Sequence, residues 1–208
     1  MMRNPYTKTI FLKSAAKVEQ LPEDSGYEVA FAGRSNAGKS SALNRLTGIR
    51  QLARTSKTPG RTQLINLFTI GDTDRRLVDL PGYGYAKVGL AMKRDWQQNL
   101  AHYLEVRQSL KGLVLLMDIR HPLKELDTTM INWAIHRELP VRILLTKADK
   151  LSRGQAQSTV LNVRKHYQTV AHLLSVQAFS SLSGLGVDEL IHALNEWFAW
   201  DDIEAQTG

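Results

Sequence analysis

Residues 33–40 read Gly-Arg-Ser-Asn-Ala-Gly-Lys-Ser and limit the possible folds more than any other stretch of this sequence. An apolar run over residues 27–32 precedes them, and a segment with helical character over residues 41–46 follows. The order predicts a strand, a glycine-bearing loop and a helix start. In the pattern GxxxxGK[ST] the backbone folds around an anion with its N–H groups pointing inward, and the helix N-terminus adds a positive dipole end. We therefore expect a phosphate-binding loop in which Lys39 reaches the β- and γ-phosphates and the Ser40 hydroxyl binds Mg²⁺.

The length of 208 residues is enough for one domain with a substantial core. We expect an N-terminal extension over residues 1–25 that packs on the domain, the domain itself over 26–200, and a polar C-terminal tail over 201–208. Cysteine is absent, which excludes disulfide scaffolds and thiolate metal sites and fits a reducing compartment. The N-terminus lacks a signal-peptide pattern and no apolar run approaches the ~20 residues that span a bilayer. The expectation is a cytoplasmic monomer without a membrane partner.

The net charge of +7 is concentrated in one part of the chain. Residues 29–71 contain no acidic residue and seven basic ones: Arg34, Lys39, Arg45, Arg50, Arg54, Lys57 and Arg61. The rest of the chain carries 20 basic and 20 acidic residues and is therefore neutral. Such a local cationic field attracts polyanions, either a nucleotide or RNA. A solvated basic face without a partner is the alternative.

Apolar runs and turn residues predict the remaining strands. A β-hairpin is predicted for residues 63–70 and 75–80, which Gly-Asp-Thr-Asp separates. Buried parallel strands are predicted for residues 113–117, 141–145 and 173–179. A second glycine-rich loop is expected over residues 81–85, with a helix after it. Further helices are expected over 123–136, after the capping pair Ser152 and Gln155, and in the amphipathic segment 187–198. The fold class is α/β: a mostly parallel sheet with one antiparallel edge strand and helices on both faces. Ligands of such sheets bind at the carboxyl ends of the strands.

Three more polar segments lie at predicted strand ends. Asp79 opens Asp-Leu-Pro-Gly, where the carboxylate can hold Mg²⁺ through a water and the amide of Gly82 can contact a γ-phosphate. In Thr-Lys-Ala-Asp, residues 146–149, Asp149 can accept the N1–H and N2 amino protons of guanine, which adenine lacks. Lys147 would lie over the base, and Thr146 would tie this loop to the phosphate loop. Backbone N–H groups of Phe179, Ser180 and Ser181 would meet the guanine O6.

The segments GRSNAGKSS, TSKTPGRTQLIN, VDLPGYGYA, LMDIRHPL and LLTKADKL together resemble the EngB (YihA/YsxC) group of translation-factor-like P-loop GTPases, over about residues 21–198. The resemblance implies a GTP-binding switch that hydrolyses GTP to GDP with Mg²⁺. It also implies a role in assembling the large ribosomal subunit, with defects in division and septation on loss. The partner would be that subunit or its rRNA, contacted through the basic switch regions.

The resemblance also implies a set of functional residues. Thr62 looks like the switch I threonine that completes the Mg²⁺ site with Ser40 and Asp79, although Thr58 competes for this role. The candidate catalytic residues are Lys39, Asn36 and Thr62. The expected nucleotide contacts are Gly33, Arg34, Ser35, Asn36, Ala37, Gly38, Lys39, Ser40, Gly60, Arg61, Thr62, Gln63, Leu64, Asp79, Leu80, Pro81, Gly82, Thr146, Lys147, Ala148, Asp149, Phe179, Ser180 and Ser181.

Two positions depart from the general GTPase pattern. Thr146 replaces an asparagine, and Tyr83 stands where Ras-like GTPases have the glutamine that orients water. Asn36 matches an asparagine that binds K⁺ in several related GTPases; capping of the loop is the alternative. We interpret Asp118 as a helix-capping residue and His121 as a surface residue, and the four tryptophans as packing residues. Rival functions are an RNA-binding module with a vestigial nucleotide site, or a GTPase in another RNA-related role.

Overall fold

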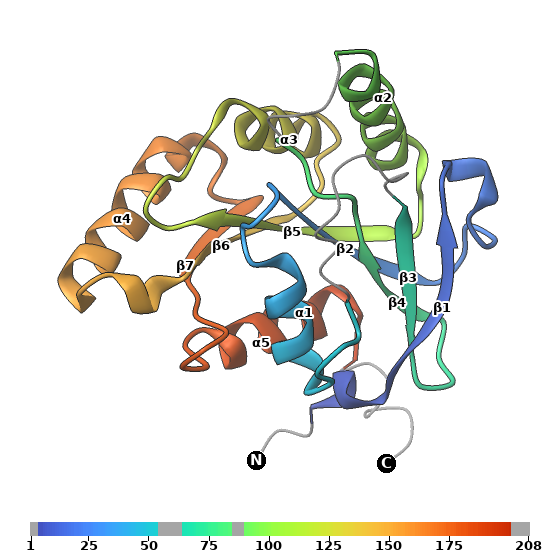
Figure 1. The fold of residues 1–208 in the computed structure, drawn as a ribbon, viewed down its shortest axis with the longest axis horizontal. Coiled ribbons are helices and arrows are strands. Elements are labelled where there is room, and N and C mark those ends of the chain that lie inside the picture. Colours follow the sequence, from blue (N-terminus) through green and yellow to red (C-terminus); the bar gives the residue numbers. More distant parts are fainter. Residues whose placement is uncertain (1–3, 54–63, 85–89, 201–208) are drawn as a thin grey trace.

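The computed structural model describes residues 4–53, 64–84 and 90–200 (Figure 1). Seven strands form one sheet in the order β1-β3-β4-β2-β5-β6-β7. The strands are β1 Thr9–Ala15, β2 Tyr27–Gly33, β3 Ile65–Ile70, β4 Arg75–Asp79, β5 Leu110–Asp118, β6 Val141–Thr146 and β7 Leu174–Ala178. The α-helices are α1 Lys39–Thr47, α2 Leu90–Val106, α3 Glu125–His136, α4 Arg153–His166 and α5 Val187–Trp197, with short 3-10 turns at Pro5–Lys8, Val18–Gln20, Ala148–Lys150 and Gln168–Val170.

The strands are parallel except for β3, which runs against both of its neighbours, β1 and β4. The predicted fold class is confirmed, including the single antiparallel strand. The sheet edge next to β3, however, belongs to β1, which lies inside the predicted N-terminal extension. The sequence pattern did not reveal β1 because only its first and last residues, Thr9 and Ala15, are buried, so no period-two alternation is present.

Two apolar layers pack on the two faces of the sheet. Figure 1 shows α1 and α5 together on one face and α2 and α3 on the other. The core under α1 and α5 includes Phe31 and Phe179, and the core under α2, α3 and α4 includes Leu115 and Val160. The central strands β2 and β5 are buried on both faces, as continuous apolar runs in parallel sheets are. This packing fixes the strand ends that carry the polar loops.

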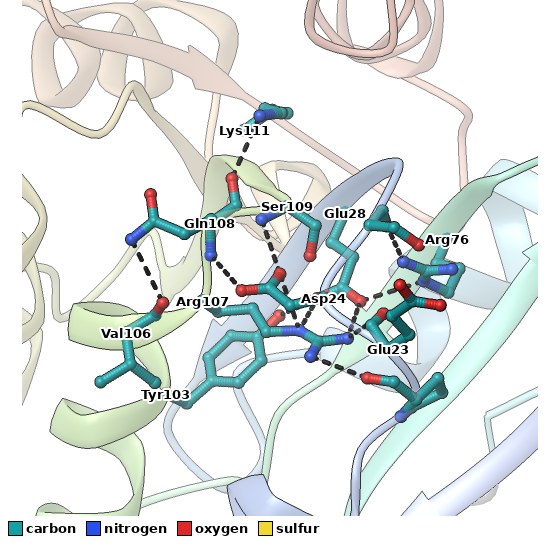
Figure 2. Close-up of polar contacts among 12 residues, drawn as sticks. Glu23, Asp24, Glu28, Arg76, Tyr103, Val106, Arg107, Gln108, Ser109 and Lys111 are labelled. Carbon is teal, nitrogen blue, oxygen red and sulfur yellow. Dashed lines mark hydrogen bonds and ion pairs between the residues drawn. The ribbon is translucent and has the colours of Figure 1, made fainter.

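A buried ionic cluster lies at the opposite end of β2 from those loops. Glu28 is fully buried and accepts hydrogen bonds from Nε of Arg76 at 3.0 Å and from Nε and Nη2 of Arg107 at 3.0 and 2.8 Å. The Tyr103 hydroxyl donates to the same carboxylate at 3.1 Å. Figure 2 shows these three side chains directed at Glu28. Tyr103 lies in the last turn of α2, and Arg107 directly follows this helix. The cluster therefore fastens the C-terminal end of α2 to the sheet.

We predict that Glu28→Gln lowers the free energy of unfolding by about 3 kcal/mol, because it removes the buried carboxylate that the Arg76 and Arg107 guanidinium groups share and leaves Arg107 only the longer, 3.6 Å contact with Asp24. Urea denaturation measures this difference. The control is Glu19→Gln, whose carboxylate is solvent-exposed and should change stability by less than about 0.5 kcal/mol. Equal effects of the two substitutions would contradict a stabilising role for the cluster.

Candidate nucleotide-binding site

The predicted phosphate loop connects β2 to α1 and has the backbone that its sequence requires. Gly38 adopts φ 90°, a left-handed conformation that disfavours any side chain, and its carbonyl accepts the Ala42 N–H that starts α1. A Cβ on Gly33 would lie 2.8 Å from the Leu116 carbonyl oxygen, so only glycine allows β2 and β5 to approach this closely. The loop therefore has the tightly folded backbone that the glycines of the motif predict.

Lys39 and Asp79 come together from different elements. The Nζ atom of Lys39, the first residue of α1, forms an ion pair with Oδ1 of Asp79 at the end of β4. Ser40 follows in the first turn of α1. An ammonium and a carboxylate thus meet at the strand ends, and the next residue of α1 carries a hydroxyl, a set of groups suited to phosphate and to a hard cation. Four of the expected contacts, Gly60, Arg61, Thr62 and Gln63, and the competing Thr58 lie outside the described residues.

Tyr83 joins the second glycine-rich loop to the phosphate loop and to α3. Its carbonyl accepts the Ser35 N–H at 2.7 Å, and its N–H donates to the Gly33 carbonyl at 3.2 Å. The side chain is 1 % exposed, and its hydroxyl donates to Oδ1 of Asp127 at 2.6 Å. Oδ2 of Asp127 accepts the Lys124 N–H at the start of α3. The residue in the position of the Ras-like glutamine therefore has its hydroxyl engaged by α3.

The Thr146 hydroxyl ties its loop to the phosphate loop, as the sequence predicts. Its Oγ1 lies 2.6 Å from the Ala37 carbonyl oxygen and 3.1 Å from that of Met117. Threonine therefore supplies a hydrogen bond at the position where the general pattern has asparagine.

Lys147 and Asp118 form a second connection to the phosphate loop. Nζ of Lys147 donates to the Asn36 carbonyl at 2.7 Å and lies 3.0 Å from Oδ2 of Asp118. Asp118 also accepts three hydrogen bonds from the backbone and guanidinium of Arg120. The hydrogen bonds from Arg120, with that from Lys147, hold the pKa of Asp118 well below its usual range.

The interpretation of Asp118 as a helix cap is wrong. Helix α3 begins at Glu125 with Lys124 as its N-cap, and Asp118 instead closes the turn at Arg120 and orients Lys147. His121 is exposed, as expected. It lines a cavity of about 390 Å³ beside the phosphate loop, together with Asn36, Asp118 and Lys147. The sequence predicts that Asp118 lies at the end of a strand, but its contact with Lys147 is visible only in the structure.

The predicted base-binding segments also meet. The Ala148 N–H donates to the Phe179 carbonyl at 3.1 Å, and the Ser180 hydroxyl donates to Oδ1 of Asp149 at 2.6 Å. The hydrogen bond from Ser180 lowers the pKa of Asp149, so its carboxylate is ionised at neutral pH. An ionised carboxylate here can accept two N–H groups from a planar base.

This arrangement of loops on a parallel α/β sheet defines the class of P-loop GTPases. A family model described as a 50S ribosome-binding GTPase matches residues 28–147. The chain is 59 % identical over 194 residues to the probable GTP-binding protein EngB of Vibrio parahaemolyticus, which covers 93 % of this chain and 88 % of that protein. Its counterpart in Aliivibrio fischeri is also 59 % identical, over 93 % of this chain and 90 % of that one. The chain belongs to the EngB family of GTP-binding proteins and is a GTPase.

Solved structures agree on the fold. A probable GTP-binding protein engB superposes with a TM-score of 0.67 at 19 % identity, covering 83 % of this chain and 98 % of that chain. Era in complex with MgGDPNP and nucleotides 1506–1542 of 16S ribosomal RNA gives a TM-score of 0.61 at 20 % identity, covering 82 % of this chain and 56 % of that one. Within the described residues, no helix is long and apolar enough to cross a membrane.

The contact between Tyr83 and Asp127 should make stability depend on pH. Burial raises the pKa of Asp127, so ionising it costs more in the folded chain, and its contribution to stability falls as the pH rises through the folded pKa. The Tyr83 hydroxyl offsets part of this cost. We predict that Tyr83→Phe lowers the free energy of unfolding by about 1–2 kcal/mol at pH 7 and by less at pH 4, measured by urea denaturation at both values.

The matched control is Tyr6→Phe. Tyr6 is also fully buried, but its hydroxyl donates to the Asn195 amide oxygen at 2.8 Å, a group that does not titrate. Its effect should be the same at both pH values. Parallel pH profiles for the two variants would show that Asp127 does not carry the dependence.

Proposed function

We propose that this GTPase assists assembly of the large ribosomal subunit, and that its loss impairs cell division and septation. It would act in the cytoplasm as a monomer. The observation that carries the proposal is the match to a 50S ribosome-binding GTPase family, joined to the acid-free segment 29–71 that surrounds the phosphate loop. A segment that contains the phosphate loop and carries only basic charged residues suits an rRNA partner whose affinity changes with nucleotide state. The intact loops favour this over a vestigial nucleotide site.

We assign the nucleotide contacts to the four loops. The phosphate loop, residues 33–40, would hold the phosphates, with Lys39 on the β- and γ-phosphates. Residues 60–64 and 79–82 would form the two switch contacts around the γ-phosphate, and residues 146–149 and 179–181 the guanine pocket. Asp149 selects guanine because its carboxylate accepts from both N1–H and the N2 amino group.

Mg²⁺ suits the oxygen donors that this chain presents. The Ser40 hydroxyl and the Asp79 carboxylate would hold it with Thr62, and the bound ion would neutralise charge on the β- and γ-phosphates. In the described residues no cluster of three or more His, Cys, Asp or Glu side chains could hold a metal ion alone.

Catalysis would depend on charge stabilisation more than on a general base. The Tyr83 hydroxyl is engaged by Asp127, so Lys39 and a bound cation would stabilise the negative charge that develops on the phosphate oxygens. The Asn36 side chain would add to this stabilisation by binding K⁺ beside the β- and γ-phosphates, and capping of the phosphate loop is the alternative role for this residue. Slow turnover that a partner accelerates is the expected behaviour.

The guanine assignment predicts the effect of Asp149→Asn. This change should weaken GDP binding by at least about 100-fold, because the amide opposes two donors with only one acceptor, and should raise the affinity for xanthosine diphosphate. Titration with fluorescent nucleotides measures both. The control, Asp72→Asn in the exposed β3–β4 turn, should change neither, and undiminished GDP binding by Asp149→Asn would place the base elsewhere.

The ribosomal assignment predicts the effect of replacing Arg54, Lys57 and Lys87 together by alanine. Binding to purified large subunits should weaken and its salt dependence should flatten, since fewer phosphate contacts release fewer counterions. Affinity for GDP should stay nearly unchanged. Sedimentation with large subunits at several salt concentrations, in the presence of a GTP analogue or GDP, measures this.

A matched triple variant replaces Lys111 near the start of β5 and Arg153 and Lys165 on α4 by alanine, and so removes the same charge from exposed positions outside the acid-free segment and the predicted switch segments. It should leave the salt dependence as in the wild type. If both triple variants lose affinity equally, net charge and not the switch regions governs binding.

A further inference from the structure

The turn after β5 lies beside the proposed base-binding loop, residues 146–149. It belongs to residues 116–123, Leu-Met-Asp-Ile-Arg-His-Pro-Leu, and none of these is among the nucleotide contacts proposed for the four loops. β5 and β6 are parallel, with Asp118 opposite Thr146, and the Ile119 N–H donates to the Thr146 carbonyl at 3.0 Å. The β5 turn and the base-binding loop therefore leave the sheet side by side.

Lys147, the second residue of the base-binding loop, is held in an uncommon conformation. Its φ of 59° is in the left-handed region, which a residue other than glycine keeps only where its surroundings fix it. Two acceptors lie next to its ammonium group: the Asn36 carbonyl oxygen at 2.7 Å and Oδ2 of Asp118 at 3.0 Å. Of these two acceptors only Asp118 carries a charge, so it acts as a counter-ion of the Lys147 ammonium.

Arg120 fixes the Asp118 carboxylate from its other side. Its backbone N–H and Nε donate to Oδ1 at 3.0 and 2.9 Å, and its Nη2 donates to Oδ2 at 2.7 Å. A bidentate guanidinium sets both the position and the plane of a carboxylate. Oδ2 is thus shared between Arg120 and Lys147, and the three side chains form one chain of contacts from the β5 turn to the base-binding loop.

The charges in this chain of contacts alternate. Asp118 lies between two cations, and without it the Lys147 ammonium would keep the neutral Asn36 carbonyl as its acceptor. The hydrogen bonds to Asp118 raise the pKa of Arg120, and the Asp149 carboxylate adds to this rise. The field of the carboxylate that is proposed to select guanine therefore reaches Arg120, so these side chains border the proposed base pocket.

A purely local role for Asp118 is the alternative. An aspartate whose carboxylate accepts the N–H two residues further on closes an Asx turn, and this role needs neither Lys147 nor a nucleotide. The contact with Lys147 is the part of the arrangement that a turn alone does not require. It connects the turn to a side chain that is predicted to lie over the base.

We propose that Asp118 and Arg120 are positioning residues for the guanine nucleotide and act through Lys147. Asp118 holds the ammonium and Arg120 holds Asp118, so the Lys147 stem is ordered before the base arrives. A side chain that is already ordered loses less rotamer freedom on binding, and the affinity is higher by that difference. The proposal rests on the proposed function, which places the base against residues 146–149, and deepens it by giving two residues of the β5 turn a role in that site.

A double-mutant cycle on GDP affinity, measured by titration with fluorescent GDP, tests this role. Asp118→Ala should weaken binding by about 10-fold, and Lys147→Met, which keeps an apolar stem but removes the ammonium, by a similar factor. In the Lys147→Met background, Asp118→Ala should change the affinity by less than about 2-fold, because the group that it holds is gone. Arg120→Ala should weaken binding by about 3-fold in the wild type and should add nothing to Asp118→Ala.

Inosine diphosphate supplies a second readout. It lacks the N2 amino group of guanine but presents a similar ring face to Lys147. Because the β5 turn acts on Lys147, Asp118→Ala should weaken the binding of GDP and of inosine diphosphate by the same factor. A larger factor for GDP would mean that the substitution disturbs Asp149, and would overturn the proposal.

Glu125→Ala is the matched control, since it removes a carboxylate from an exposed position in the first turn of α3. It should change the GDP affinity by less than about 2-fold. Asp118→Asn keeps the test valid if Asp118→Ala does not fold, because the amide retains an acceptor for the turn but not the charge. It should weaken GDP binding by about 3- to 10-fold.

Equal factors for Asp118→Ala in the wild-type and Lys147→Met backgrounds would restrict Asp118 to its own turn and overturn the proposal. So would a further loss from Arg120→Ala in the Asp118→Ala variant, since Arg120 would then contact the nucleotide itself. If Lys147→Met and Asp149→Asn weaken GDP binding and Asp118→Ala does not, the positioning role fails and the base pocket stands. If none of the three weakens it, the base pocket fails as well.

Discussion

The site depends on how the outward carbonyl groups of the phosphate loop are satisfied. A loop that directs its N–H groups at an anion must leave carbonyl oxygens on its outer side, and buried carbonyls without donors are costly. Two neighbouring segments supply three donors. The segment after β4 supplies the backbone N–H of Tyr83 to Gly33, and the end of β6 supplies the Thr146 hydroxyl to Ala37 and the Lys147 ammonium to Asn36. The loop is thereby held open toward the ligand by contacts that the ligand does not make.

The pairing of Lys39 with Asp79 adds an electrostatic constraint. Both side chains are largely buried, and isolated charges in such surroundings are unfavourable. If Lys39 binds phosphate and Asp79 binds Mg²⁺ as proposed, each group exchanges one opposite charge for another. Neither charge is left unpaired at any stage when phosphate and cation arrive together. This favours binding of the nucleotide with its metal ion over binding of either alone.

The sequence predicted the parts of this structure that are encoded locally. Buried strands such as β5 appear as continuous apolar runs, the box of Ser152 and Gln155 starts α4, and the tie from Thr146 follows from motif order at strand ends. The parts that the sequence did not predict depend on contacts between residues that are far apart in the chain. β1 has an irregular burial pattern that only pairing with β3 explains, and Asp127 meets Tyr83 across 44 residues. Local periodicity carries no information about such pairs.

These distant contacts also limit where the second glycine-rich region can move. Tyr83 is fixed by the phosphate loop and by Asp127, and the other end of α2 is fixed by Arg107 on the buried Glu28. The two anchors differ in kind. Tyr83 contacts the same loop that would bind phosphate, whereas the Glu28 cluster lies at the opposite end of β2. The end of α2 next to Arg107 is thus fastened to the sheet by contacts that are separate from the loop that would bind phosphate.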